Sequence, residues 1–130
     1  MKPYATVDRS QFPLVYVRFT GNEPGHENFT AYLAELSALY EDHVKLAIVF
    51  DAREAILPGL KYQKLQANWL KGHWDTMRSY CLGTAYVIEN TAVRGILRMI
   101  FAIQKQPVPY EVSSTLEEGM AWARQRLIKE

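Results

Sequence analysis

The sequence predicts a single α/β domain over residues 1–130, with a mixed, mostly parallel sheet of about five strands and four helices. A short apolar run that ends in a carboxylate, at 45–51, is one reason for this prediction. Another is the alternation of strand-like and helix-like segments after an opening pair of strands. The third is length, because 130 residues suit one hydrophobic core, and no repeat, linker or low-complexity segment marks a second domain.

The chain opens with two short strands and a helix. Residues 4–8 and 14–20 have the pattern of strands, and we expect them to pair as a hairpin. Turn-forming residues fill the next segment, 20–25. Apolar residues then recur at helical spacing and predict a helix that ends near Glu41; they are Phe29, Leu33, Leu36 and Tyr40.

The middle of the chain predicts a buried strand and one long helix. The apolar run at 45–51 is typical of a strand covered on both faces, so we expect 45–50 to be the central strand of the sheet. A helix is predicted over about 61–81 from apolar residues that share one stripe. Gly83 is expected to stop this helix.

The last part predicts two further strands, each followed by a helix. Residues 84–89 are expected to form the fourth strand, and Thr91 to cap the helix after it, which two prolines then end. A short last strand is predicted at 110–112. Two overlapping capping boxes within 114–118 predict the start of the final helix.

Composition and charge limit which binding partners and which cellular compartment we expect for this chain. Hydrophobic residues make up 48% of the chain, charged residues 22%, and the formal net charge is +1. No excess of positive charge is present to bind a phosphate backbone, so nucleic acid is not an expected partner. No run of about 18 apolar residues predicts a transmembrane segment. The single cysteine, Cys81, and the lack of an apolar run in the first eight residues favour a cytoplasmic protein.

Three segments together resemble the SpoIIAA-like branch of the STAS superfamily. They are the buried strand that ends at Asp51, the strand at 84–89, and the tail at 109–122, whose helix opens with a Leu-Glu-Glu-x-x-x-Trp pattern. The resemblance implies a STAS-like fold and a regulatory role in a bacterial protein. Because this branch is similar in fold to CRAL-TRIO lipid-transfer domains, the resemblance also implies an apolar ligand as an alternative.

The resemblance directs attention to the loop after the central strand. Anti-anti-sigma factors of the STAS superfamily are switched by phosphorylation of a serine there, in an Asp-Ser-Ser-Gly-like motif. Here the loop has the sequence Asp51-Ala52-Arg53-Glu54-Ala55, so Asp51 matches while Ala52 and Arg53 replace the hydroxyl residues. We predict that this loop binds without phosphorylation, that the Arg53 guanidinium at a helix amino terminus receives an anion, and that Arg53→Ala leaves the melting temperature nearly unchanged.

Loops at the carboxyl ends of parallel strands are the usual ligand sites of such sheets. We expect these loops to bring together the candidate binding residues Asn22, Asp51, Arg53, Glu54, Glu89, Asn90 and Arg94. The alternative is structural. In that interpretation Asp51 or Thr91 caps a helix, and the arginines form ion pairs with neighbouring carboxylates.

A second set of candidates lies on the predicted helices, at Trp69, His73, Trp74, Met99 and Ile103. Positions 69 and 74 are about 140° apart on a helix, so we expect one tryptophan to be exposed beside His73 as an interface or pocket rim, or else to cover the loop before the fourth strand. Met99 and Ile103 widen the apolar face of their helix. This edge is expected to form a weak homodimer contact, line a pocket, or lie between the sheet and the last helix.

Enzyme signatures are missing from the sequence. The three histidines lack zinc-site spacing, and no P-loop, G-x-G-x-x-G or G-x-S-x-G motif is present, so no cofactor or metal is predicted. We therefore expect a non-catalytic regulatory or protein-binding module whose partner meets the strand-end loops and the long helix. The alternative is a carrier or sensor of a small apolar or lipid-like ligand. A third hypothesis is an enzyme that uses Asp51 and Arg53.

Overall fold

The computed structural model describes residues 2–129, and within them it has five strands and five helices. The strands are β1 (Ala5–Asp8), β2 (Leu14–Phe19), β3 (Leu46–Asp51), β4 (Cys81–Val87) and β5 (Tyr110–Ser113). The helices are α1 (His26–Ala38), α2 (Leu60–Gly72), α3 (Trp74–Tyr80), α4 (Thr91–Ile103) and α5 (Leu116–Lys129). In this part of the chain no helix is both long enough and apolar enough to cross a membrane.

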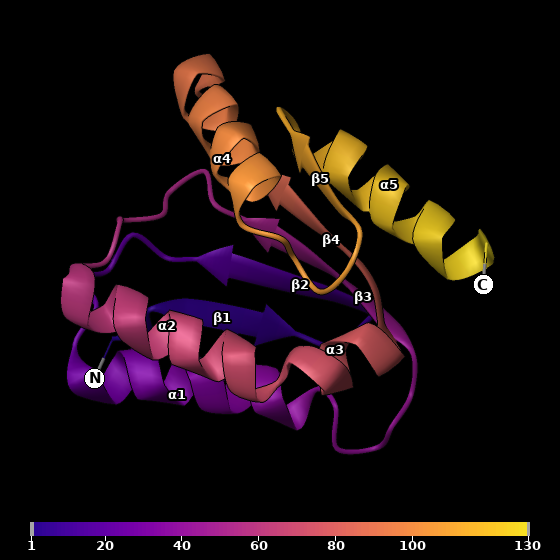
Figure 1. Cartoon of the computed structure of the whole chain (residues 1–130), viewed down its shortest axis with the longest axis horizontal. Helices are drawn as coiled ribbons and strands as arrows, with labels where there is room; N and C mark the ends of the chain where they lie inside the picture. Colours follow the sequence, from indigo (N-terminus) through magenta and orange to yellow (C-terminus); the bar gives the residue numbers. More distant parts are fainter. Residues whose placement is uncertain (1, 130) are drawn as a thin grey trace.

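The five strands form one sheet in the order β1-β2-β3-β4-β5. The pair β1–β2 is the predicted antiparallel hairpin, and all other neighbours are parallel, which confirms a mixed, mostly parallel sheet. Right-handed crossovers in a sheet built in sequence order place every connecting helix on the same face. Accordingly α1, α2 and α3 cover one face of the sheet (Figure 1). Helix α5 follows the last strand, connects no two strands, and covers the other face.

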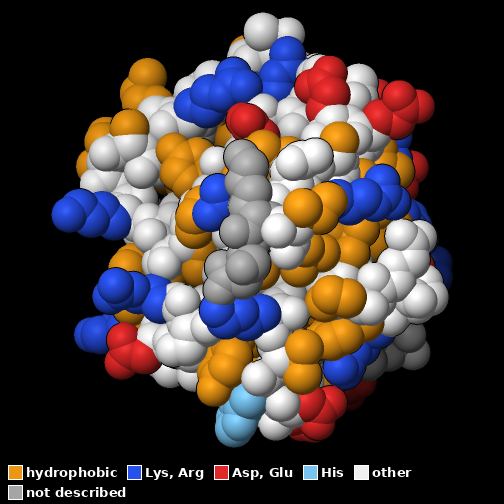
Figure 2. Space-filling model, turned by 90° about the vertical axis from the view of Figure 1, so that its right-hand side faces the viewer, with side chains coloured by type: hydrophobic (Ala, Val, Ile, Leu, Met, Phe, Trp, Pro, Cys, Tyr) orange, Lys and Arg blue, Asp and Glu red, His pale blue; other side chains and the backbone are white. Residues whose placement is uncertain are grey.

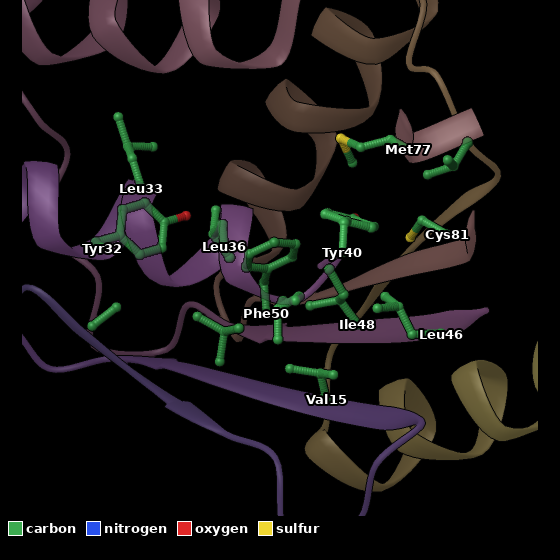
Figure 3. Close-up of a cluster of buried hydrophobic side chains, with 14 of the residues drawn as sticks. Val15, Tyr32, Leu33, Leu36, Tyr40, Leu46, Ile48, Phe50, Met77 and Cys81 are labelled. Carbon is green, nitrogen blue, oxygen red and sulfur yellow. The ribbon is translucent and has the colours of Figure 1, made fainter. Parts of the chain in front are cut away.

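Strand β3 is the centre of the sheet, as predicted, and all six of its residues are buried. Alternate side chains on a strand point to opposite faces. Leu46, Ile48 and Phe50 therefore point toward α1 and α3 (Figure 3), whereas Ala47 and Val49 join the core beneath α5. The buried run is apolar throughout because neither of its faces meets water.

The predicted single helix over 61–81 is wrong, because two helices occupy this segment and the helix count is five rather than four. The break is at His73, which has φ −110° and ψ 10° and follows Gly72, a poor helix former. Strand β4 then begins at Cys81, so Cys81 lies in a strand and Gly83 is not a helix stop. Burial raises the pKa of the Cys81 thiol to about 11.

Gly83 has a packing role instead. A Cβ at this position would lie 2.7 Å from the Trp122 ring, so only glycine lets this ring of α5 rest against β4. We expect Gly83→Ala to destabilise the domain by about 1–3 kcal/mol through overpacking, as measured by urea unfolding. Gly95→Ala is the matched control, because nothing lies within 4 Å of its Cβ position. Gly95→Ala should raise the free energy of unfolding by up to about 1 kcal/mol, because alanine favours a helix more than glycine does. Equal effects at both sites would contradict the packing role.

Helix α4 lies beside the β4–β5 end of the sheet, where Phe101 supplies its aromatic contacts. The Phe101 ring is 5.3 Å from the Tyr86 ring and 4.8 Å from the Tyr110 ring, measured between centroids. Helix α5 packs on the opposite face of the sheet. The expectation that α4 is enclosed between the sheet and the last helix is therefore wrong.

Charge is well mixed on the face that carries the end of α5. Figure 2 shows positive and negative side chains scattered among hydrophobic ones there, without a broad area of one sign. This distribution agrees with the formal net charge of +1.

Candidate functional site

A hollow of about 370 Å³ lies at the carboxyl edge of the sheet. The register explains its position: Arg18 of β2 is opposite Asp51 of β3, which is opposite Val87 of β4, so three parallel strands end together. We call this hollow the edge site. It is lined by Arg18, Phe19, Asp51, Arg53, Glu54 and Glu89.

The Asp51 carboxylate is the best-buried charge of the edge site, and its side chain is only 3% exposed. Arg53 holds it with two parallel hydrogen bonds of 2.8 Å, from Nε to Oδ1 and from a terminal nitrogen to Oδ2. The Arg53 backbone N–H donates to Oδ1 at 3.2 Å, and the Tyr16 hydroxyl donates to Oδ2 at 2.5 Å. A buried carboxylate needs such partners, and here its oxygens are fully occupied.

These contacts shift the acidity of all three groups. Burial alone would raise the pKa of Asp51, but the hydrogen bonds from Arg53 and Tyr16, with the Arg53 charge, outweigh it and hold that pKa below its ordinary value. Burial first, then the bond to Asp51, raises the pKa of the Tyr16 phenol to about 12. Arg53's own hydrogen bonds to Asp51, together with the Asp51 charge, raise the pKa of the Arg53 guanidinium. The trio therefore carries one negative and one positive charge at neutral pH.

The structure assigns Arg53 a different role from the one predicted. Helix α2 begins only at Leu60, so Arg53 does not lie at a helix amino terminus, and its guanidinium already binds a carboxylate within its own loop. Asp51 caps no helix either; it fixes the loop that follows β3. The structural alternative thus describes the Asp51–Arg53 pair better than the anion-receiving interpretation does.

Four charged residues of the edge site are accessible. The Arg53 side chain is 36% exposed but is held by Asp51, and the other three are Arg18, Glu54 and Glu89. One Arg18 terminal nitrogen lies 3.3 Å from Glu54 Oε2, and these side chains are 43% and 67% exposed. Glu89 is exposed and lies two residues after the end of β4. An exposed pair of this kind is weak and can exchange partners at low cost.

Sequence reasoning placed Asp51, Arg53, Glu54 and Glu89 together correctly, because all four follow parallel strands. It missed Arg18, Phe19 and Tyr16. These residues belong to the strand β2 itself rather than to the loop after it. The parallel register of β2 and β3, which sets Arg18 opposite Asp51, is the signal that would have revealed them.

The other three strand-end candidates lie outside the lining of the hollow. Asn22 donates through its amide to the Pro3 carbonyl at 2.9 Å. Asn90 caps α4 by accepting a 3.0 Å bond from the Val93 backbone N–H, so the cap is Asn90 and not Thr91. Arg94 donates to backbone carbonyls of the β4–α4 connection, at 2.8 Å to residue 88 and 2.7 Å to residue 89.

No protein-family model matches the sequence, and no curated protein matches it. A solved structure does match: an uncharacterized protein of the DUF3478 family, with a SpoIIAA-like fold, from Shewanella loihica PV-4. The TM-score is 0.69, the identity is 14%, and the match covers 92% of this chain and 91% of that one. This chain has a SpoIIAA-like fold. At that identity the likeness concerns the fold alone, and it confirms the architecture expected from the resemblance.

The aromatic candidates of this SpoIIAA-like fold form an internal junction rather than an exposed rim. The Trp69 and His73 rings stack at 4.3 Å, and both side chains meet Ser37 of α1. The Trp69 indole N–H donates to Ser37 Oγ at 2.9 Å, and His73 Nε2 lies 3.2 Å from the same oxygen. Trp69 and Trp74 are both half-buried, so the expected exposed tryptophan is absent. These residues join α1 to α2 and α3.

Met99 and Ile103 lie on α4 and are 66% and 78% exposed, as an apolar edge requires. They do not line the edge site. Within residues 2–129, no group of three or more His, Cys, Asp or Glu side chains is arranged to hold a metal ion.

Proposed function

We propose that this chain is a non-catalytic regulatory module that binds a protein partner at the edge site. The observation that supports this most is the contrast within the site. Asp51, Arg53 and Tyr16 are bonded to one another and set the shape of the loop, whereas Arg18, Glu54 and Glu89 present charges of both signs to solvent. A fixed scaffold with exchangeable charges at its rim suits electrostatic recognition of another protein surface.

Binding at this site is controlled by occupancy rather than by phosphorylation. Neither Ala52 nor Arg53 has a hydroxyl that a kinase could modify. The nearby Tyr16 hydroxyl is engaged with Asp51 at 2.5 Å. The concentration of the partner, and not a covalent switch in this loop, then sets the bound fraction.

The proposal can be tested by reversing one rim charge. We expect Glu54→Lys to weaken capture of the partner at least tenfold, because it replaces an exposed carboxylate with an ammonium next to Arg18. The measurement is quantitative mass spectrometry of polypeptides retained from a lysate of the native host. Glu35→Lys is the control, since Glu35 is an exposed carboxylate near the carboxyl end of α1 and does not line the edge site. A polypeptide retained equally by both variants would contradict binding at the edge site.

A small apolar or lipid-like ligand is the second candidate function. It is favoured by two leucines that follow Glu54 in the chain, Leu57 and Leu60, which are 84% and 74% exposed. They lie where the loop after β3 enters α2. Neighbouring exposed apolar side chains are typical of a surface that a ligand or partner covers.

A further inference from the structure

Helix α4 has its apolar side turned outward. Its residues include none that are buried, although its sequence separates apolar from polar residues sharply. The apolar residues that face solvent are Val93 (46% exposed), Ile96 (57%), Met99 (66%), Ile100 (42%) and Ile103 (78%). A surface helix of a monomer normally turns this side to the core.

The two arginines of α4 instead bond to the backbone at the end of the sheet, although Arg98 itself remains exposed. Arg94 donates to the Ile88 and Glu89 carbonyls, and Arg98 donates to the Val112 carbonyl of β5 at 2.9 Å. Phe101 adds the aromatic contacts with Tyr86 and Tyr110. These bonds fix the rotation of the helix, so its outward apolar side is a consequence of specific contacts.

The outward residues are spaced for packing against another helix. Val93, Ile96, Ile100 and Ile103 follow one another at intervals of three, four and three residues, which is the spacing of a coiled-coil seam. We propose that a second copy of this chain covers the seam, with the two α4 helices packed antiparallel about a twofold axis.

Antiparallel pairing makes the seam complementary to itself. With the axis at the middle of the helix, Val93 faces the partner's Ile103 and Ile96 faces the partner's Ile100. The same arrangement brings Glu89, just before α4, near the partner's Lys105, just after it. A parallel pair would oppose Glu89 to its own copy, and its helix dipoles would also be aligned unfavourably.

The charges favour a protein partner over a lipid surface. Helices that lie in a membrane interface use lysine and arginine on their polar side to meet anionic headgroups. Here the guanidinium groups of both α4 arginines already donate to backbone carbonyls of this chain. The seam is about 20 Å long, because 13 residues rise about 1.5 Å each, and one helix pair of this size gives a weak dimer.

Sedimentation equilibrium over a micromolar concentration series tests the dimer. The wild-type chain should change reversibly from monomer to dimer across the series, and Ile96→Glu should weaken the association at least tenfold. Ile128→Glu is the control, because Ile128 is also an exposed isoleucine (75%, against 57% for Ile96) but lies on α5. It should associate like the wild type. Thermal melting of each variant checks that the fold is intact. A wild-type chain that stays monomeric, or a dimer unaffected by Ile96→Glu, would overturn the proposal.

A charge exchange tests the antiparallel arrangement. Val93→Glu and Ile103→Lys should each weaken the dimer, and the variant with both substitutions should recover much of the loss, because each new carboxylate then faces a new ammonium across the axis. A parallel pair would set like charges together and show no recovery, which would contradict the proposed geometry. If the chain is monomeric but binds vesicles of phosphatidylcholine and phosphatidylglycerol, and Ile96→Glu abolishes that binding, the seam belongs to a lipid surface and the proposal fails.

Discussion

Ile48→Asp should abolish cooperative folding. Ile48 is 2% exposed on the central strand, where Val15 and Thr84 are its partners on the two neighbouring strands. The Ile48 side chain lies in the hydrophobic core beneath α1 and α3 (Figure 3), and this cluster contains no cation that could pair with a carboxylate there. Burying an unpaired charge costs many kcal/mol, which exceeds the stability of about 5–15 kcal/mol typical of a small domain.

The measurement is a thermal melt followed by circular dichroism. Ile128→Asp is the control, since the same change at an exposed position of α5 should leave the melt nearly unchanged. A cooperative melt of the Ile48→Asp variant close to that of the wild type would contradict the assignment of β3 as the central, doubly covered strand.

Arg53→Ala should destabilise the domain by about 1–3 kcal/mol at neutral pH, in contrast to the expectation drawn from the sequence. The substitution leaves Asp51, which is 3% exposed, with the Tyr16 hydroxyl as its remaining side-chain donor. Urea unfolding at pH 7 measures the loss. Arg18→Ala is the control, because it breaks an exposed pair with Glu54 and should cost about 0–1 kcal/mol.

The effect of Arg53→Ala should depend on pH in a defined direction. The folded-state pKa of Asp51 is lowered, so its ionised form adds stability above the unfolded-state pKa of about 4, and this contribution is lost as pH falls through the lower folded-state pKa. Without Arg53, burial of Asp51 opposes ionisation. The difference between wild type and variant should therefore be largest above about pH 5 and narrow toward pH 3. A difference that is constant over this range would show that Arg53 acts through packing and not through Asp51.

The fold was largely predictable because burial leaves a simple pattern. The run at 45–51 is apolar without interruption since both faces of β3 are covered, and this alone identified the central strand. The two opening strand patterns predicted the hairpin, and the alternation of strands with helices after it predicted that the remaining strands run parallel. Gly72 is the sequence signal for the break at His73, but one glycine within a helical pattern does not fix a break. The contacts of His73 and Trp69 with Ser37 on another helix are tertiary and could not be predicted from the sequence.

The candidate site was predictable in its location but not in its internal bonding. Strand ends identify an edge of the sheet, so Asp51, Arg53, Glu54 and Glu89 were grouped correctly. Which of these charges are bonded to each other depends on side-chain geometry that spacing does not encode. Likewise, the periodicity of α4 shows that it has an apolar side, but only the contacts of Arg94, Arg98 and Phe101 show that this side faces outward.

Native mass spectrometry of the chain purified from its own host tests the central claim most directly. A binding module at the edge site should appear as the chain together with a different polypeptide, and Glu54→Lys should remove that polypeptide while Glu35→Lys retains it. A preparation that carries a small apolar molecule and no second polypeptide would contradict the protein-binding account and favour a ligand carrier.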